Sequence, residues 1–216
     1  MLRISVPIIA LLLLAATACE KRPRLRPNPV ETGITGGELI FEEDFAKGLD
    51  HWNVTSKHWK VVDGRLFTGD GPNQNKGVWL KGVSLPENVR IEFDATSVQG
   101  NKPQFEGDMK FEFGGDRPEH ASGYIIIFGG WKNSINTIAR HDEHGEGRLA
   151  VESTHKVTDG QTYHFKVIRL DGEVKWFLGE SLVLSVKDRE PARGGAFGFN
   201  DWDSRVYFDN LKIFAL

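Results

Sequence analysis

A cluster of aromatic, amide and cationic residues comes directly after an apolar run at residues 124–128 (YIIIF). Two glycines, at 129 and 130, permit a bulge that redirects the next residues. An indole ring can pack on sugar C–H groups, while amide and guanidinium groups donate hydrogen bonds to hydroxyls. We therefore predict one wall of a carbohydrate site here, formed by Trp131, Asn133, Asn136 and Arg140. A hairpin whose Trp packs into the core and whose polar groups meet water is the competing interpretation.

Glycoside hydrolysis needs two carboxyl groups, about 5 Å apart for retention of configuration and wider for inversion. Glu92 and Asp94 alternate along one predicted strand, and Glu112 lies on a second strand that we expect to be its neighbour. These three acids are the catalytic candidates. Lys110 shares the face of Glu112 and is a candidate sugar contact. The competing interpretation is an outward polar face paired across strands, which alternating charges normally indicate.

Residues 141–144 (HDEH) invite a metal-site interpretation. Their spacing does not match a helical zinc motif, and adjacent residues of a strand or turn point in divergent directions. A polar hairpin tip is the better prediction. The sequence also has no Gly-x-Ser-x-Gly elbow and no phosphate-binding Gly-Lys-Ser/Thr loop.

The elements that must position these residues are strands. Apolar and polar residues alternate in several short segments, and the intervening stretches carry turn signals such as Asp-Gly at 63–64, 159–160 and 171–172. The alternating segments are 89–95, 108–113, 163–167, 173–178 and 205–214. Many short strands joined by turns, with no convincing helix, predict an all-β fold of two packed antiparallel sheets.

Four segments resemble the concanavalin A-like lectin/glucanase superfamily, and look most like the 3-keto-disaccharide hydrolase-like bacterial lipoproteins. They are FEEDFAKGLDHWNV (41–54), HWKVVDGRLF (58–67), the hairpin at 163–186 and the closing segment 194–216. The resemblance covers nearly all of residues 39–216 and implies a jelly roll that holds sugars on a concave sheet. It implies fold more strongly than activity, because the superfamily mixes enzymes and lectins.

Departures from the family patterns bear on activity. The laminarinase pattern Glu-x-Asp-x-x-Glu is interrupted by Ser97, and the loop FNDWDS (199–204) lacks the histidine usual in the 3-keto-disaccharide hydrolase-like group. The resemblance nevertheless places Trp202 of this loop at the cleft edge, as a sugar contact or a plug for the sandwich. It also pairs an acid of the first strand, Glu43 or Asp44, with Asp209 of the last strand, which would suit a structural Ca²⁺.

Residues 1–18 have the pattern of an export signal: Arg3 precedes an apolar stretch that is too short to span a bilayer comfortably. Cys19, the single cysteine, ends a segment that resembles a bacterial lipobox, which implies lipidation and membrane anchoring. Glu20 then implies outer-membrane sorting. Cleavage after Ala18 without lipidation is the alternative. Residues 19–37 are Pro-rich and predict a flexible tether, and 38–216 form the jelly-roll domain.

The chain has 27 basic and 30 acidic residues, a net charge of −3, which argues against a nucleic-acid partner held by general electrostatics. We expect an exported lipoprotein of the bacterial cell envelope, anchored in the outer membrane through Cys19, that binds carbohydrate without catalysis. The alternative is a glycoside hydrolase or lyase acting on a poly- or oligosaccharide. A structural envelope protein without a ligand is the third hypothesis.

Overall fold

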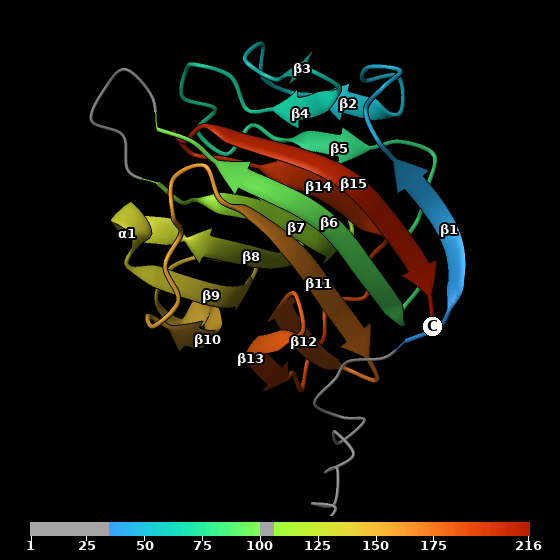
Figure 1. Ribbon diagram of the computed structural model, residues 1–216. Helices are drawn as coiled ribbons and strands as arrows, with labels where there is room; N and C mark the ends of the chain where they lie inside the picture. The colour runs from blue at the N-terminus through green and yellow to red at the C-terminus, as the bar shows by residue number, and fades with distance from the viewer. Residues whose placement is uncertain (1–34, 100–105) are drawn as a thin grey trace, which may run out of the picture.

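The computed structural model describes residues 35–99 and 106–216, which fold into two antiparallel sheets. Residues 1–34, with the predicted signal, Cys19 and most of the tether, lie outside this part. Figure 1 shows β15, β6 and β11 of one sheet in front of β14, β7 and β8 of the other. Within the described ranges, no helix has the length and apolar character needed to cross a membrane. The predicted all-β sandwich is confirmed.

The eight-stranded sheet contains most of the segments with clear alternation. Its order is β13 (Ser181–Lys187), β12 (Glu173–Leu178), β11 (Thr162–Leu170), β6 (Val89–Ser97), β15 (Val206–Ala215), β4 (Arg65–Phe67) and β3 (Lys60–Val62), and β1 (Glu38–Glu43) also pairs with β15. The strands β6 and β11 pair over eight residues, from Thr162 opposite Thr96 to Arg169 opposite Val89. This register fixes one face inward and the other toward solvent.

The seven-stranded sheet carries the aromatic and amide cluster that begins at Trp131. Its order is β10 (Arg148–Glu152), β9 (Ile135–Arg140), β8 (Tyr124–Gly129), β7 (Met109–Gly115), β14 (Ala196–Asn200), β5 (Val78–Leu80) and β2 (Trp52–Val54). Between β8 and β9 is a four-residue turn, α1 (Gly130–Asn133), and a 3₁₀ turn (Gly145–Gly147) precedes β10. Every residue of β8 is buried, as its unbroken apolar run predicts.

The core between the sheets is rich in aromatic rings. Phe93 of β6 stacks on Phe165 of β11 at 4.8 Å between centroids and meets Phe111 of β7 edge-on, also at 4.8 Å. Residues Met109, Phe111 and Phe113 of β7 all point into this core. Because side chains alternate along a strand, Lys110 and Glu112 must point to the opposite, outer face of the seven-stranded sheet.

Candidate functional site

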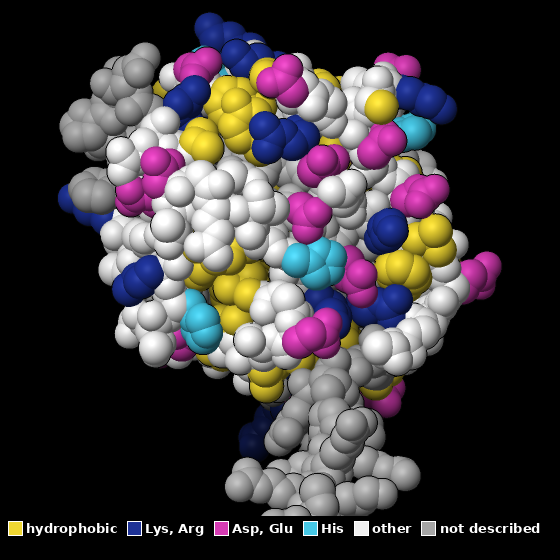
Figure 2. All heavy atoms as spheres, in the orientation of Figure 1, with side chains coloured by type: hydrophobic (Ala, Val, Ile, Leu, Met, Phe, Trp, Pro, Cys, Tyr) yellow, Lys and Arg dark blue, Asp and Glu magenta, His cyan; other side chains and the backbone are white. Residues whose placement is uncertain are grey.

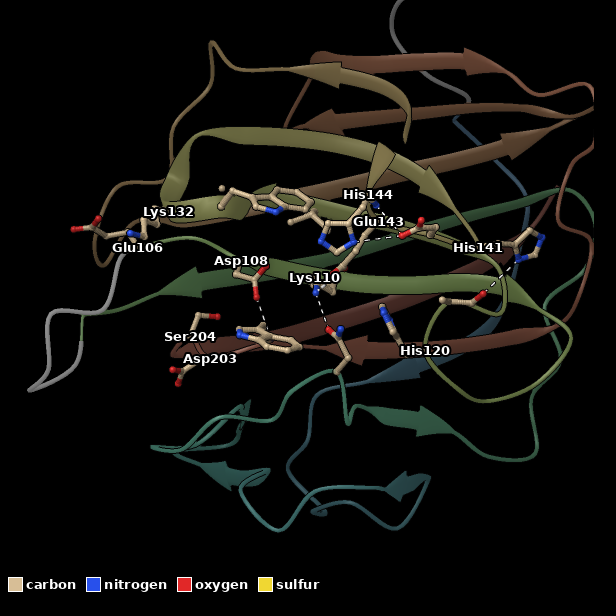
Figure 3. A pocket seen from close by; sticks show the side chains of 17 residues that line it. Glu106, Asp108, Lys110, His120, Lys132, His141, Glu143, His144, Asp203 and Ser204 are labelled. Carbon is tan, nitrogen blue, oxygen red and sulfur yellow. Dashed lines mark hydrogen bonds and ion pairs between the residues drawn. The ribbon is translucent and has the colours of Figure 1, made fainter. Parts of the chain in front are cut away.

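A cleft of about 570 Å³ lies over the outer face of the seven-stranded sheet (Figure 3). Strand β7 supplies its floor, and the loops around β7, β9 and β14 form its walls. His141 lies at one end of the cleft, and Glu106 and Lys132 lie at the other. Other residues that line it are Asn75, Asp108, Lys110, His120, Trp131, Glu143, His144 and Trp202.

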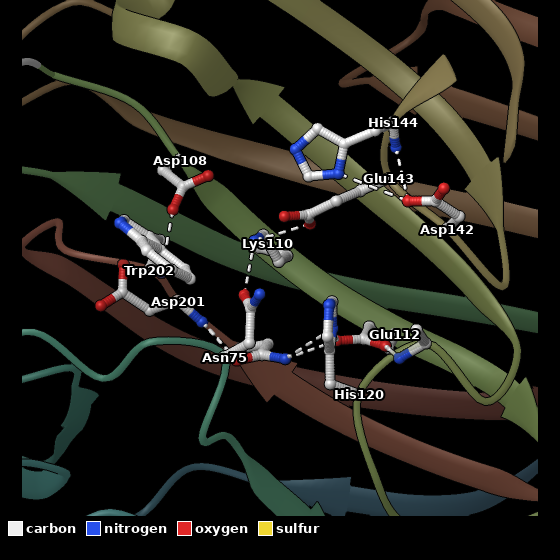
Figure 4. A network of polar contacts seen from close by, with 12 residues as sticks. Asn75, Asp108, Lys110, Glu112, His120, Asp142, Glu143, His144, Asp201 and Trp202 are labelled. Carbon is white, nitrogen blue, oxygen red and sulfur yellow. Dashed lines mark hydrogen bonds and ion pairs between the residues drawn. The ribbon is translucent and has the colours of Figure 1, made fainter. Parts of the chain in front are cut away.

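The floor is built around a buried cation. The side chain of Lys110 is 1% exposed; its Nζ forms an ion pair with Glu143 at 2.8 Å and donates a hydrogen bond to Asn75 Oδ1 at 2.8 Å (Figure 4). Burial lowers the pKa of Lys110, but the carboxylates of Asp108, Glu143 and Glu112 act in the opposite direction, and the net pKa is raised. The ammonium therefore stays charged and holds the β9–β10 loop against the sheet.

A second buried acid, Glu112, organises the neighbouring wall. Its carboxylate is 2% exposed and accepts hydrogen bonds from the Ala121 backbone N–H at 2.8 Å and from the side-chain amide of Asn200. The remaining partner is His120, whose Nδ1 is 2.7 Å from Oε1 of Glu112. Glu112 therefore fixes the loop between β7 and β8 and the orientation of the His120 ring.

Two tryptophans stand on different walls of the cleft. Trp202 is 53% exposed, and its backbone N–H donates to Asp108 Oδ2 at 3.0 Å. Trp131 is half-buried; its ring meets His144 edge-on at 5.6 Å between centroids, and the Arg148 guanidinium lies 3.9 Å from the ring centroid. Figure 4 shows Trp202 on one side of Lys110 and His144 on the other. Trp202 thus offers the more accessible ring.

The turn α1 presents Trp131 through an unusual backbone. Three successive residues, Trp131, Lys132 and Asn133, have left-handed φ of 49°, 62° and 57°. Non-glycine residues adopt this region at a cost, so the surroundings must hold it. The Asn133 side chain does so, because its Oδ1 accepts from the Val157 N–H at 2.9 Å and its Nδ2 donates to the Val157 carbonyl at 2.8 Å.

A fully buried carboxyl group supports the loop that carries Trp202. Asp201 Oδ1 accepts hydrogen bonds from the hydroxyl and backbone N–H of Ser204, and Oδ2 accepts from Asn73 Nδ2 at 3.1 Å. Burial raises the pKa of Asp201 to about 7, and repulsion from Asp108 acts in the same direction.

The structure corrects three of the predicted sugar contacts. The side-chain amide of Asn133 is engaged with the Val157 backbone. Asn136 is buried; it accepts from the Gly129 N–H at 2.7 Å and donates to the His155 carbonyl at 2.8 Å. Arg140 pairs with Asp188 at 2.6 Å. These groups hold turns and strand ends together, and the three residues do not line the cleft, whereas Trp131, Lys110 and Trp202 do.

The predicted catalytic group of Glu92, Asp94 and Glu112 is not assembled. Glu92 and Asp94 lie on β6 of the eight-stranded sheet and alternate with core residues, so they face outward on the far side of the sandwich. Strands β6 and β7 are consecutive in sequence but belong to different sheets, with the aromatic core between them. The expectation that they are sheet neighbours is wrong.

On that far face the acids have local partners. Asp94 lies 2.8 Å from His164 Nδ1 and accepts from Asn210 Nδ2 at 2.8 Å, and Glu92 pairs with Arg90 at 2.7 Å. Figure 2 shows acidic, basic and histidine side chains interspersed on the face formed by these strands. These residues form an outward polar face paired across strands, which was the competing interpretation of the alternating charges.

The predicted calcium pair involves Asp44 and Asp209. Burial raises the pKa of Asp209, and the negative charges of Asp94 and Asp44 act in the same direction. Glu43 is used otherwise: it is buried and accepts from the Phe45 N–H at 2.9 Å. Among the described residues, no group of three or more His, Cys, Asp or Glu side chains could hold a metal ion. Because calcium takes six to eight oxygens, two carboxylates alone do not fit it, and the ion stays a prediction.

Sequence reasoning missed His120, Glu143 and Asn75 as cleft residues. All three lie in loops, where no periodicity predicts direction. The sequence predicts that the polar tip at 141–144 faces water, whereas Glu143 turns inward to Lys110. The sequence did contain one signal that an acid such as Glu143 would turn inward, namely Lys110, because a lysine within a buried strand requires an acidic partner.

Comparisons with known proteins agree with the fold. The family model described as a domain of unknown function, DUF6250, matches residues 116–211. No curated protein matches the sequence. Among solved structures, the carbohydrate-binding module CBM66 from Bacillus subtilis is similar, with a TM-score of 0.60 and 19% identity over 77% of this chain and 97% of that one.

Two further solved structures have the same architecture. The laminarinase from Flavobacterium sp. UMI-01 gives a TM-score of 0.59 at 15% identity, over 82% of this chain and 100% of its own. The exoplasmic/lumenal domain of VIP36, in a Ca²⁺/Man-bound form, gives 0.63 at 10% identity, over 83% and 92%. The protein therefore has the jelly-roll fold of the concanavalin A-like lectins and glucanases. The finer resemblance to the 3-keto-disaccharide hydrolase-like group stays a prediction.

Proposed function

We propose that the protein binds a glycan in the cleft over the seven-stranded sheet. The observation that carries this proposal is the exposed ring of Trp202, which faces a hydrogen-bonding floor with Trp131 and His144 on another wall. Sugar sites combine one or two aromatic platforms with a few convergent polar groups. Structural neighbours described as a carbohydrate-binding module and a laminarinase support the same class of ligand.

Each part of the cleft has a role in this proposal. The Trp202 ring packs on the C–H face of one sugar unit. Asn75 meets hydroxyl groups from a polar floor that the buried Lys110–Glu143 pair keeps rigid. Because these groups are already held by hydrogen bonds and an ion pair, little side-chain entropy is lost when a sugar binds.

Substitution of the exposed indole tests the proposal. We expect Trp202→Ala to weaken glycan binding by about 1–3 kcal/mol, the scale for loss of one aromatic anchor. Binding is measured on a glycan array and then by titration calorimetry with the best ligand. The matched control is Leu182→Ala, which removes an exposed apolar side chain of β13 in the other sheet. Equal affinity of Trp202→Ala and wild type, with the fold intact, would contradict the proposed site.

Cleavage of the bound glycan is the second candidate. Two carboxylates of the cleft, Asp108 and Glu143, lie on opposite sides of Lys110 (Figure 4), and paired acids are what glycoside hydrolysis needs. Incubation with a polysaccharide panel would then release new reducing or unsaturated ends. Release that Asp108→Asn abolishes would establish an enzyme. Retention without release would establish a binding protein.

We also propose that the mature protein is a lipoprotein of the outer membrane. Support comes from the export signal, the lipobox-like segment and the single cysteine, Cys19. Two or more acyl chains give stable attachment, which one chain does not. We expect Cys19→Ser to move the protein from the membrane fraction to the soluble fraction and to abolish labelling by an alkyne fatty acid. A Cys19→Ser protein that still sediments with membranes would contradict lipid anchoring.

A further inference from the structure

We infer that the cleft selects uncharged or cationic glycans, such as those containing amino sugars, and rejects glycans that carry carboxylate or sulfate groups. This inference rests on the proposed glycan-binding function and names the class of ligand for the same cleft.

The residues that line the cleft carry a net negative charge. The lining has two lysines, Lys110 and Lys132, and five acids, namely Glu106, Asp108, Asp142, Glu143 and Asp203. With its three histidines neutral, the lining carries a net charge of −3. A concave site lined mainly by one sign of charge concentrates ligands of the opposite sign and repels those of the same sign.

The Lys110 ammonium, at the centre of the cleft floor, already has partners within the protein. Lys110 Nζ is held by Glu143 and Asn75, each at 2.8 Å, and the side chain is 1% exposed. A ligand carboxylate would have to displace Glu143 and leave that acid buried without its partner, which is strongly unfavourable. Lys110 therefore serves the protein and does not provide an anion site.

The aromatic platform has an acid beside it. Asp108 Oδ2 accepts the backbone N–H of Trp202, which places this carboxylate at the base of the exposed ring. An ammonium group above an indole face is attracted by the ring quadrupole, and a nearby carboxylate adds to that attraction. The same position repels a sulfate or a uronate.

The histidine in the wall contributes an acceptor. An ionised Glu112 carboxylate can only accept, so the Nδ1 of His120, 2.7 Å away, must carry the proton. When the ring is neutral, its lone pair is then on Nε2. Since His120 lines the cleft, this nitrogen matches a ligand hydroxyl or amine. Acceptors thus predominate in the cleft, and the complementary ligand is rich in donors.

Arg148, a cation in contact with the Trp131 wall, does not reverse the negative charge of the lining. Arg148 is not among the lining residues, and its guanidinium lies 3.9 Å from the Trp131 ring centroid. Its Nε donates to the Glu143 carbonyl at 2.8 Å. These two contacts engage the guanidinium with groups of the protein.

A glycan array provides the test. Full-length protein in detergent is applied to neutral glycans, deacetylated chitin oligomers, and acidic glycans such as mannuronate oligomers and sulfated galactans. We expect the hits to be neutral or amine-bearing. By titration calorimetry, below the pKa of the sugar amine, glucosamine oligomers should bind roughly tenfold more tightly than mannuronate oligomers of equal length, and added salt should reduce this difference.

Variants separate the inference from the function on which it rests. Asp108→Asn should lower the affinity for glucosamine oligomers severalfold more than it lowers the affinity for neutral N-acetylated oligomers of equal length, whereas Asp50→Asn, at an exposed acid outside the cleft, should change neither. Acidic glycans among the best ligands, with binding that Trp202→Ala still abolishes, would overturn the charge selection alone. An array without any ligand would overturn the proposed function and the selection together.

Discussion

At the scale of single residues, the cleft depends on buried polar groups that each have a partner. Lys110, Glu112 and Asp201 are almost completely buried, and each forms at least two hydrogen bonds or ion pairs. A buried charge is strongly unfavourable unless it is paired. These residues therefore position the loops of the cleft, and the exposed Trp202 is left to meet the ligand.

Asp201 gives the stability of the protein a characteristic pH dependence. Its pKa is raised by burial to about 7, above the value of 3.8 expected in the unfolded chain. The folded state therefore binds this proton more tightly, so the stabilisation is complete below about pH 4 and is lost as the pH rises through about 7. We expect wild type to lose about 1–4 kcal/mol of unfolding free energy over this range through Asp201.

Urea unfolding at several pH values measures this contribution. In Asp201→Asn the group no longer titrates, so the decrease in stability between acidic and neutral pH should be smaller than in wild type. The matched control is Asp50→Asn, at an exposed position, which should keep the wild-type slope. If the unfolding free energy of Asp201→Asn fell with pH as steeply as that of wild type, the Asp201 carboxyl group would not be the cause of the pH dependence.

At the scale of elements, the short turn α1 decides where Trp131 lies. The turn begins after Gly129, whose φ is 73°, and continues through three left-handed residues. Asn133 ties it to Val157, and Gly129 allows the chain of residue 107 to approach closely. The cleft wall that carries Trp131 therefore depends on the left-handed backbone of α1, and contacts with residues outside the β8–β9 hairpin hold that backbone in place.

We expect Gly129→Ala to destabilise the protein by roughly 1–3 kcal/mol, because alanine is strained at this φ and its Cβ lacks space. That Cβ would be 2.6 Å from Val157 Cγ2 and 2.8 Å from Gly107 Cα. Thermal unfolding measures the loss. Gly179→Ala is the control: its φ is 57° and its Cβ would meet nothing within 4 Å, so it bears the φ strain alone. Equal losses in the two variants would show that packing around Gly129 is unimportant.

At the scale of the whole molecule, the sandwich has two outer faces with different character. The cleft lies on the seven-stranded sheet, whereas Glu92, Asp94 and His164 lie on the eight-stranded sheet. The aromatic core separates them. A ligand in the cleft therefore has no contact with the acids of β6.

This separation predicts which variants leave glycan binding unchanged. Asp94→Asn should keep the affinity within about twofold, since distant substitutions without shared partners act independently. Lys110→Met, on the cleft side, should weaken binding because Glu143 loses its partner and the floor is disturbed. Calorimetric titration with the array's best glycan compares the two. A large loss in Asp94→Asn, with thermal stability unchanged, would place the ligand on the other face.

The sequence alone predicted much of the architecture. Alternation in residues 89–95, 108–113 and 163–167 predicted strands that are present as β6, β7 and β11. The two-sheet sandwich could be inferred from these strands and their turns. Alternation also placed Lys110 and Glu112 together on the face opposite Phe111, because the side-chain period of a strand is fixed by local geometry.

Only the tertiary structure decided which polar residues meet in one place. Sheet membership separated Glu92 from Glu112, although their strands are consecutive in sequence. Asn136 does not line the cleft because its amide bonds the His155 carbonyl, and Arg140 does not because it pairs with Asp188. Glu143 does line the cleft, because it forms an ion pair with Lys110. Periodicity is a property of neighbouring residues, whereas strand pairing and loop direction depend on contacts between residues far apart in the chain.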